Sequence, residues 1–285
     1  MVKRVLITGG AQRLGAELVQ CFARAGWQVW CHYHRSAAQA QALQARLQAE
    51  GLRIELIAAD LGDESALRAM MAHIAAHGGA LQALVNNAAL FEPDSGLDFR
   101  PELAIKQMQV NLLAPLLLGQ LLAQQLGHTQ AQPAAPGSTP RRMPPPSATE
   151  LPHEPRINAC LIHILDQKVF NLNPDYFSYT LSKQALERAV ALQAQALAPT
   201  VRVCGVAPGL LYQSGPQSQE NFHLASRINL LRQPIAPQDV AQTCRFLAET
   251  PSITGTTLCI DNGQHLVPLN QDVMFAVDQW LGQPA

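Results

Sequence analysis

The sequence lacks an excess of charge of either sign. Its 285 residues include 20 Lys and Arg against 21 Asp and Glu, a formal net charge of −1, and charged residues make up only 14%. A protein that binds nucleic acid generally needs a surplus of Lys and Arg to neutralise phosphates. A basic membrane-surface protein needs the same surplus. The composition therefore argues against a nucleic-acid partner and against binding to a membrane surface.

Long apolar runs are also missing. No stretch approaches the roughly 20 apolar residues that a membrane-spanning helix requires. The apolar start of the chain breaks at Gly9 and Gly10, which makes it too short for a signal peptide. The six cysteines form no CxxC pair and no metal-type spacing, and four of them lie in or beside strand-like runs. These patterns predict a cytoplasmic protein with reduced core cysteines and no metal site.

Apolar runs alternate with helical patterns along most of the chain. Strands are predicted at 5–8, 28–33, 53–59, 81–86, 157–165, 201–206 and 256–260. Helices are predicted at 15–25, 37–49, 65–76, 103–126, 179–196, 237–249 and 272–280. Strands separated by helices of this length indicate a parallel sheet, and nearly continuous apolar strands indicate burial on both faces. The predicted fold class is α/β, a doubly wound three-layer sandwich with a mainly parallel sheet of seven strands.

One segment departs from this pattern. Residues 128–156 hold 8 of the 20 prolines and no Phe, Trp or Tyr. Consecutive prolines fit neither a helix interior nor a central strand, so we expect a disordered, proline-rich surface insertion. The chain is thus predicted to be one domain, 1–285, with an insertion at about 128–156 and a C-terminal tail at about 264–285.

A glycine-rich turn follows the first predicted strand. The run TGGAQRLG, residues 8–15, joins that strand to the first helix. Glycines let the backbone approach a pyrophosphate, and the N-terminus of the helix supplies N–H groups and a partial positive charge. A glycine turn alone is weak evidence, but its position between the first strand and the first helix indicates a dinucleotide site.

The end of the second predicted strand indicates which dinucleotide is bound. A site for NAD usually has an acid there, which accepts a hydrogen bond from the ribose 2′-hydroxyl. This strand ends instead at His34, Arg35 and Ser36, which are donors suited to a 2′-phosphate. Arg13 in the glycine turn can reach the same phosphate. One such residue could equally be a solvated surface side chain, but the cluster favours NADPH over NADH.

A tyrosine and a lysine four residues apart are the candidates for catalysis. Tyr179 and Lys183 stand at the start of a predicted helix, on one face, so both heads can reach one site. A nearby ammonium stabilises phenolate and should lower the pKa of Tyr179 towards neutrality, which makes it a useful proton donor. The spacing alone occurs often by chance. Here it accompanies the Asn-Asn-Ala-Ala run at 86–89, Asn111 in the long helix, and Pro208 and Gly209 after the sixth strand.

These motifs together resemble the short-chain dehydrogenase/reductase family over almost the whole chain. The resemblance implies a Rossmann-like fold and an NADPH-dependent oxidoreductase. It implies that Tyr179 donates the proton, that Lys183 holds the nicotinamide ribose and tunes Tyr179, and that Asn111 supports a proton-relay water. A homotetramer built on the long helices 103–126 and 179–196 is also implied. The expected cofactor-binding residues are Gly9, Arg13, Leu14, Gly15, His34, Arg35, Ser36, Asp60 (for the adenine amine), Leu61, Asn87, Ala88, Lys183, Pro208 and Gly209.

One departure from the family pattern narrows the chemistry. Where the family usually has a serine, 13 residues before the tyrosine, this chain has Asp166. An ionised carboxylate offers no donor to a carbonyl oxygen that gains negative charge. It suits a substrate rich in N–H donors, and burial can raise its pKa so that it helps to protonate nitrogen. Asp166 therefore favours C=N over C=O reduction, although it could also merely cap the loop after its strand.

Three features together resemble the pteridine reductase branch of the family: the TGxxxRxG turn, the His-Tyr-His-Arg-Ser run and Asp166. That branch reduces dihydropterins with NADPH and stacks the flat pterin on an aromatic side chain shortly after the Asn-Asn-Ala run. Phe91 stands at that place, where stacking adds roughly 0.5–1.5 kcal/mol, and a core position is the alternative. The resemblance implies hydride transfer to a pterin carbon while Tyr179, assisted by Asp166, protonates the adjacent nitrogen. Phe91, Asp166 and Tyr179 are the expected substrate-binding residues.

Two other functions fit parts of the sequence. A general carbonyl reductase of the same family, acting on a ketone or quinone, would keep the fold, the cofactor and Tyr179 and would lose only the pterin argument. A non-enzymatic dinucleotide sensor would be expected to lack the tyrosine or the lysine, and Asn111, Tyr179 and Lys183 are all present. The sequence leaves open the oxidation level of the pterin and the role of the insertion.

Overall fold

A single parallel sheet forms the centre of the fold. The computed structural model describes residues 2–127, 159–215 and 217–282. In these residues seven strands pair in the order β3-β2-β1-β4-β5-β6-β7, and every neighbouring pair is parallel. This confirms the predicted sheet. The strands are β1 (Arg4–Ile7), β2 (Gln28–Tyr33), β3 (Ile54–Ala58), β4 (Ala83–Asn86), β5 (Ala159–Ile164), β6 (Val201–Pro208) and β7 (Thr256–Ile260).

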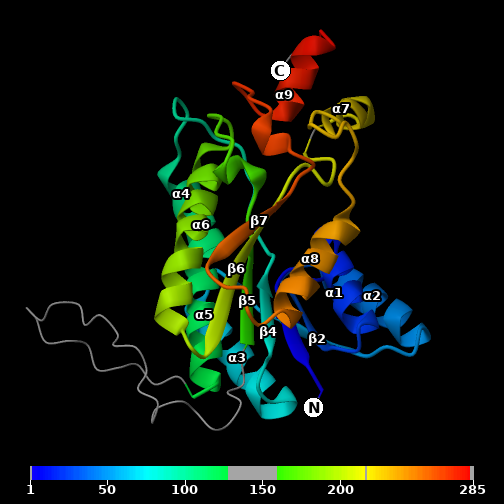
Figure 1. The fold of residues 1–285 in the computed structure, drawn as a ribbon, viewed down its shortest axis with the longest axis vertical. Coiled ribbons are helices and arrows are strands. Elements are labelled where there is room, and N and C mark those ends of the chain that lie inside the picture. Colours follow the sequence, from blue (N-terminus) through cyan, green and yellow to red (C-terminus); the bar gives the residue numbers. More distant parts are fainter. Residues whose placement is uncertain (1, 128–158, 216, 283–285) are drawn as a thin grey trace, which may run out of the picture.

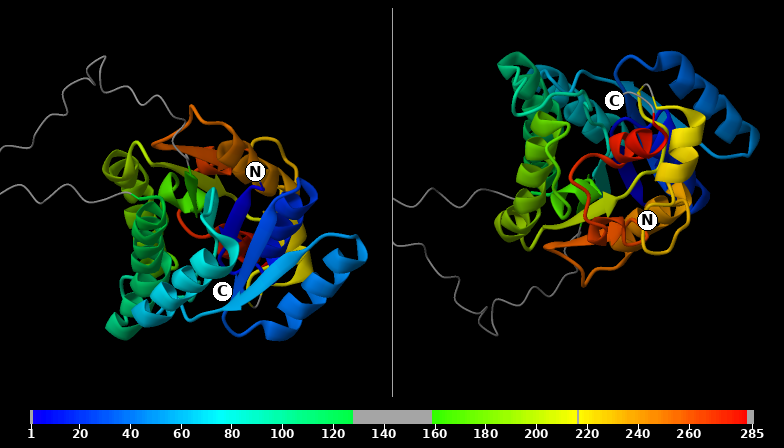
Figure 2. Two further views of the ribbon diagram at one scale, coloured as in Figure 1. Left: turned by 90° about the horizontal axis from the view of Figure 1, so that it is seen from below. Right: turned by 90° about the horizontal axis from the view of Figure 1, so that it is seen from above.

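Helices cover both faces of the sheet and complete three layers (Figure 1). One face carries α1 (Arg13–Arg24), α2 (Ala37–Ala49) and α8 (Pro237–Glu249). The other face carries α3 (Glu64–Gly78), α5 (Ala114–Gln125) and α6 (Phe177–Leu197). Figure 2 shows the two groups of helices on opposite sides of the sheet. Among the described helices, none has both the length and the apolar character needed to cross a membrane.

Alternation along the strands divides the core into two halves. Val5 and Ile7 of β1 lie in the cluster under α1, whereas Leu6 between them lies in the cluster under α5 and α6. Successive side chains of a strand point to opposite faces, so a strand covered on both sides is apolar at most of its positions. On β4, Val85 and Leu84 divide in the same way. This burial explains the continuous apolar runs in the sequence.

The long helical stretch predicted at 103–126 is present and contains one irregular turn. It divides into α4 (Pro101–Met108), a π-helical turn (Gln109–Leu113) and α5. The turn contains Asn111, whose side chain bonds to the backbone of Leu90 and to Ser182. A π-turn widens the helix locally and often marks a functional site. The predicted helical stretch is confirmed, but a hydropathy pattern does not register the change from α-helical to π-helical turns within it.

The C-terminal residues form a small layer beyond the carboxyl ends of the strands (Figure 1). It contains α7 (Gln219–Ala225), a short turn (Gln264–Leu266) and α9 (Val273–Trp280). The helix predicted at 272–280 is therefore present, with Asp272 as its N-cap. The insertion predicted at 128–156 lies outside the described residues, which stop at 127 and resume at 159.

Candidate active site

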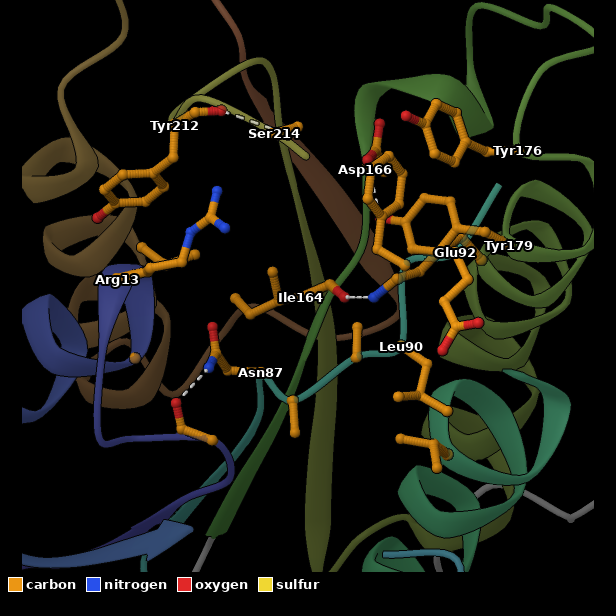
Figure 3. Close-up of a pocket in the computed structure, with 18 of the residues that line it drawn as sticks. Arg13, Asn87, Leu90, Glu92, Ile164, Asp166, Tyr176, Tyr179, Tyr212 and Ser214 are labelled. Carbon is orange, nitrogen blue, oxygen red and sulfur yellow. Dashed lines mark hydrogen bonds between the residues drawn. The ribbon is translucent and has the colours of Figure 1, made fainter. Parts of the chain in front are cut away.

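A cleft of about 1260 Å³ opens at the carboxyl edge of the sheet (Figure 3). Ligands of doubly wound folds bind at this edge, because the loops after the strands gather there. Nearly all the predicted site residues line this one cleft. They are Gly9, Arg13, Leu14, Gly15, His34, Arg35, Ser36, Asp60, Leu61, Asn87, Ala88, Phe91, Asp166, Tyr179, Lys183, Pro208 and Gly209.

The glycine turn is tightly fixed at the foot of the cleft. Gly9 adopts a φ of 62°, and a Cβ on Gly15 would lie 1.9 Å from the carbonyl oxygen of Gly9. Asn87 donates from its side-chain amide to the carbonyls of Thr8 (2.9 Å) and Gly9 (3.2 Å). Helix α1 has no side-chain cap and no acid in its first turn. Its N-terminal N–H groups can therefore bind an anion.

His32, which sequence reasoning passed over, supports the same turn from β2. Its Nδ1 accepts a hydrogen bond from the backbone N–H of Gly9 at 3.1 Å, and its Nε2 lies 3.1 Å from the carbonyl of Ala59. Burial lowers the pKa of His32 to about 4. The ring is therefore neutral near pH 7 with its proton on Nε2, because only that tautomer satisfies both partners. The only hint of this role in the sequence was the His-Tyr-His run at 32–34, which places a histidine inside an apolar strand.

Basic side chains gather where β2 ends. His34 and Arg35 are exposed beside the cleft, and His34 Nε2 lies 3.7 Å from Asp60 Oδ2. Arg13 donates to the carbonyl of Gln213 at 2.9 Å, and its guanidinium lies 5.1 Å from the ring centre of Tyr212 (Figure 3). Asp60 also accepts from the backbone N–H of Gly62 at 2.8 Å. The predicted 2′-phosphate residues thus share one edge of the cleft, and Arg13 links that edge to the loop after β6.

Tyr179 and Asp166 form a pair on the other side of the cleft. The hydroxyl of Tyr179 donates to Oδ2 of Asp166 at 2.9 Å (Figure 3). Burial raises the pKa of Asp166, against the opposing effects of the Lys168 N–H and of nearby charges. Burial and the neighbouring carboxylate together raise the pKa of Tyr179 well above its usual range. The proton shared by this pair therefore resides on the phenol when Asp166 is ionised.

The pKa of Tyr179 is raised in this structure, so the expected shift towards neutrality needs correction. The ammonium of Lys183 donates to the carbonyl of Ile164 at 2.7 Å and lies 5.7 Å from the ring centre of Tyr179. Burial lowers the pKa of Lys183 itself to about 8. The nearest charge to the phenol is the carboxylate of Asp166, which opposes ionisation of the tyrosine. The four-residue spacing placed the side chains of Tyr179 and Lys183 on one face of a helix. It could not show that the carboxylate of Asp166 lies beside the phenol.

Asp166 serves two purposes at once. Its Oδ1 accepts from the backbone N–H of Lys168 at 2.9 Å and so caps a short helical turn (Gln167–Val169). Its Oδ2 faces Tyr179. Asp166 therefore does cap the turn after its strand, which was the alternative role expected from the sequence. Its second oxygen, Oδ2, remains directed at Tyr179.

Three aromatic rings line the same region of the cleft. Phe91 is 40% exposed, so it is not a core residue. Its ring stacks on Tyr176 with centroids 4.0 Å apart and meets Tyr179 edge-on at 4.7 Å. Tyr176 stacks in turn on Phe275 of α9 at 6.2 Å. Nothing in the sequence pattern marked Tyr176, which adopts a left-handed φ of 53° just before α6.

Asn111 is the one predicted residue that the structure places away from the cleft lining. Its side chain accepts from the backbone N–H of Leu90 at 2.8 Å and donates to the Leu90 carbonyl (2.9 Å) and to Ser182 Oγ (3.0 Å). Ser182 in turn donates to the carbonyl of Tyr179. Asn111 therefore joins the loop after β4 to the helix that carries Tyr179.

Two family models together match most of the chain. The model described as short chain dehydrogenase matches residues 3–133, and the model described as enoyl-(acyl carrier protein) reductase matches residues 159–265. The gap between the matches contains most of the proline-rich segment. The first match carries the glycine turn and the second carries Tyr179 and Lys183.

Curated proteins of similar sequence include two pterin reductases. Pteridine reductase 1 of Leishmania tarentolae is 27% identical, over 92% of this chain and 96% of its own. Dihydromonapterin reductase of Citrobacter koseri is 25% identical, over 92% and 96% respectively.

Solved structures of similar fold include two complexes with NADP. FolM alternative dihydrofolate reductase 1 from Brucella canis has a TM-score of 0.78 and 31% identity, over 93% of this chain and 94% of its own. The protein of the same name from Brucella suis has a TM-score of 0.78 and 32% identity, over 93% and 97%.

Proposed function

The chain belongs to the short-chain dehydrogenase/reductase family, and from this premise we propose that it uses NADPH to reduce a dihydropterin to the tetrahydro form. One observation carries the proposal. The hydroxyl of Tyr179 donates to the carboxylate of Asp166, and the ring of Tyr179 meets the partly exposed ring of Phe91 edge-on. That combination suits a flat ring that bears N–H donors and must gain a proton on nitrogen.

The residues present fit NADPH. The glycine turn leaves no room for a Cβ at Gly15, and the uncapped N-terminus of α1 can accept the pyrophosphate. Arg35 and Arg13 supply positive charge, and His34 a hydrogen-bond donor, where the 2′-phosphate would lie. Two related structures of about one-third identity hold NADP. Lys183, at the other end of the cleft, would hold the nicotinamide ribose.

The substrate half of the cleft suits a pterin. Phe91 offers a ring face next to Tyr179, and a planar heterocycle gains from stacking there. Asp166 supplies carboxylate oxygens that can accept N–H bonds from an aminopyrimidinone. Curated relatives that align over nearly their whole length are a pteridine reductase and a dihydromonapterin reductase.

In the proposed mechanism Tyr179 donates a proton to the substrate and Asp166 then returns a proton to Tyr179. When bound, the nicotinamide supplies a hydride to the carbon of the C=N bond. Tyr179 gives its hydroxyl proton to the nitrogen of that bond. Burial raises the pKa of Asp166, so its carboxyl group can carry a proton and return it to the phenolate oxygen across the 2.9 Å contact. The buried ammonium of Lys183 stabilises the negative charge that passes through this pair.

A substrate panel tests the proposal. Wild-type protein is mixed with NADPH and, separately, with 7,8-dihydrobiopterin, dihydromonapterin, dihydrofolate and a set of ketones and quinones, and NADPH oxidation is recorded. We expect the dihydropterins to react fastest, and Tyr179→Phe to lose about 100-fold or more of that rate. Turnover of ketones with none of pterins would instead identify a general carbonyl reductase. NADPH binding without any turnover would identify a dinucleotide sensor.

We also propose that the protein works as a homotetramer in the cytoplasm. The outer faces of the π-turn and of α6 expose Leu113, Leu181 and Leu192, and paired helices of this kind can bury such side chains against a second copy. Light scattering during size-exclusion chromatography measures the mass directly. A monomer at micromolar concentration would contradict the assembly.

A further inference from the structure

Helix α9 is held apart from the main core of the protein. Its buried residues Val273 and Val277 join Ala225 of α7 in a small apolar cluster of their own. The two large clusters lie on the faces of the sheet, whereas α7 and α9 lie beyond its carboxyl edge (Figure 1). A short helix with so small a core depends on specific contacts to keep its place. Those contacts therefore decide whether α9 stays over the cleft.

One of these contacts is a buried ion pair, and another is the side chain of the buried Asn221 of α7, which donates to Met274 and Asp278 of α9. The ammonium of Lys168 lies 3.0 Å from Oδ2 of Asp272, and the two side chains are only 3% and 16% exposed. Lys168 also donates to Asn173 Oδ1 (2.6 Å) and to the carbonyl of Asp175 (3.4 Å). A cation so deeply buried is stable only while its partners remain in place. Lys168 itself lines the cleft, two residues after Asp166.

Asp272 starts α9 and anchors it with the same side chain. Its Oδ1 accepts from the backbone N–H of Met274 at 3.0 Å, which caps the helix. Its own backbone N–H donates to Asp175 Oδ2 at 2.7 Å. Asp272, Val273 and Met274 all line the cleft. The beginning of α9 is thus both a wall of the cleft and the point at which Lys168 holds it.

The same lysine supports the aromatic rings. Its ammonium lies 5.6 Å from the ring centre of Tyr176, within the range of a cation–π contact. Tyr176 lies between Phe91 and Phe275, and Phe275 belongs to α9. Figure 3 shows Tyr176 and Tyr179 on the same side of the cleft. Lys168 therefore connects the ring proposed to stack on substrate with the helix that closes the cleft beside it.

We propose that Lys168 is a positioning residue that ties α9 to the substrate half of the cleft and so sets the affinity for substrate. The identity of that substrate rests on the proposed function, but the attachment of α9 does not. The contacts of Lys168 and Asp272 described above lie in residues 166–176 and 272–275, not in the glycine turn or at the end of β2. Loss of the ion pair should therefore weaken substrate binding and spare NADPH binding.

The attachment is tested first without substrate. Amide hydrogen exchange is measured for wild type, Lys168→Met, Asp272→Asn and the double variant. Asparagine retains the side-chain oxygen that caps α9 and removes only the charge. We expect exchange in 273–280 to accelerate about 10-fold or more in each single variant, while β4 and β5 stay protected. Lys168→Met alone leaves the charge of Asp272 buried and unpaired, whereas the double variant removes both charges. The amides of α9 should therefore exchange more slowly in the double variant than in Lys168→Met.

Steady-state kinetics then test the consequence for substrate. For Lys168→Met we expect KM for 7,8-dihydrobiopterin to rise about 10-fold, with kcat and the Kd of NADPH within about twofold of wild type. Lys168→Arg should restore most of the affinity, because it keeps the charge. Lys3→Met is the matched control: it removes a lysine from the exposed ion pair with Glu249, at the opposite edge of the sheet, and should leave every measurement unchanged.

The outcomes separate the two proposals. Unchanged exchange in α9 of Lys168→Met, or faster exchange with an unchanged KM, overturns the role of Lys168. Wild-type protein that binds NADPH but reduces no pterin overturns the proposed substrate. In that case the role of Lys168 is still decided by two measurements: hydrogen exchange in α9, and KM for whichever compound of the panel reacts.

Discussion

Tyr179 and Asp166, 13 residues apart in the sequence, share a hydrogen bond of 2.9 Å in which the phenol donates to the carboxylate. The carboxylate comes from the end of β5 and the phenol from the first turn of α6, so the sheet and a helix each hold one partner. An acid at this place opposes loss of the tyrosine proton until a substrate can take it. Much of the specificity that we propose follows from this one contact.

Replacing Asp166 by serine should change substrate preference. Asp166→Ser removes the carboxylate and supplies a hydroxyl donor that suits a carbonyl oxygen. We expect kcat/KM for dihydropterin to fall about 100-fold, with that for simple ketones nearly unchanged or raised. The measurement is NADPH oxidation on both substrate types side by side. Equal losses on the two would show that Asp166 is only a cap of the turn that follows β5.

Phe91 should contribute to affinity through its ring face. Phe91→Leu keeps an apolar side chain and removes the stacking surface, which is worth roughly 0.5–1.5 kcal/mol, so KM for the pterin should rise about 3- to 10-fold. The Kd of NADPH, measured by fluorescence titration, should not change. A Phe99→Leu variant, at another exposed ring that pairs with Phe177, is the matched control. An unchanged KM would remove Phe91 from the substrate site.

Arg35 should distinguish NADPH from NADH. It stands exposed beside the cleft where β2 ends, and a charge-assisted bond to a 2′-phosphate needs that guanidinium. Arg35→Ala should raise KM for NADPH about 10-fold and leave KM for NADH within about twofold. Arg53→Ala removes an exposed arginine at the opposite end of the sheet and serves as control. Equal effects on both cofactors would contradict a phosphate contact.

His32 should make stability depend on pH below neutrality. Burial lowers its pKa to about 4 from the usual 6.5. Between these values the unfolded chain binds a proton that the folded chain does not, so stability falls as the pH drops through this window, by up to about 1.4 kcal/mol per pH unit. His32→Gln cannot titrate, and its amide can both accept from Gly9 and donate to Ala59.

Urea unfolding at pH 7 and pH 5 checks this prediction. The wild type should lose more free energy of unfolding between the two values than His32→Gln does. Equal losses would mean that the ring is already protonated in the folded protein, and the hydrogen bond from Gly9 would then need another explanation.

The parts of the fold that depend on local pattern were predictable. Val5, Leu6 and Ile7 are all apolar because β1 is covered on both faces, and such runs revealed every strand. The glycine turn, His34 to Ser36 and the pair Tyr179 and Lys183 could be assigned to one cleft because parallel strands end at the same edge.

The parts that depend on contacts between distant segments were not predictable. Tyr176 matters because Phe275, 99 residues later, stacks on it, and Lys168 matters because Asp272 neutralises it. Neither residue lies in a recognisable motif. The raised pKa of Tyr179 also escaped prediction, because spacing reveals which side chains share a face but not how far each is buried.

The junction between α5 and β5 has a consequence for engineering. Gly127 and Ala159 flank the proline-rich segment, and Ala159 begins β5, whose other end carries the loop with Asp166. The whole length of a core strand therefore separates this junction from the reacting groups. A change of chain length at this junction is therefore expected to leave those groups in place, and the same position suits a fluorescent reporter or an affinity handle.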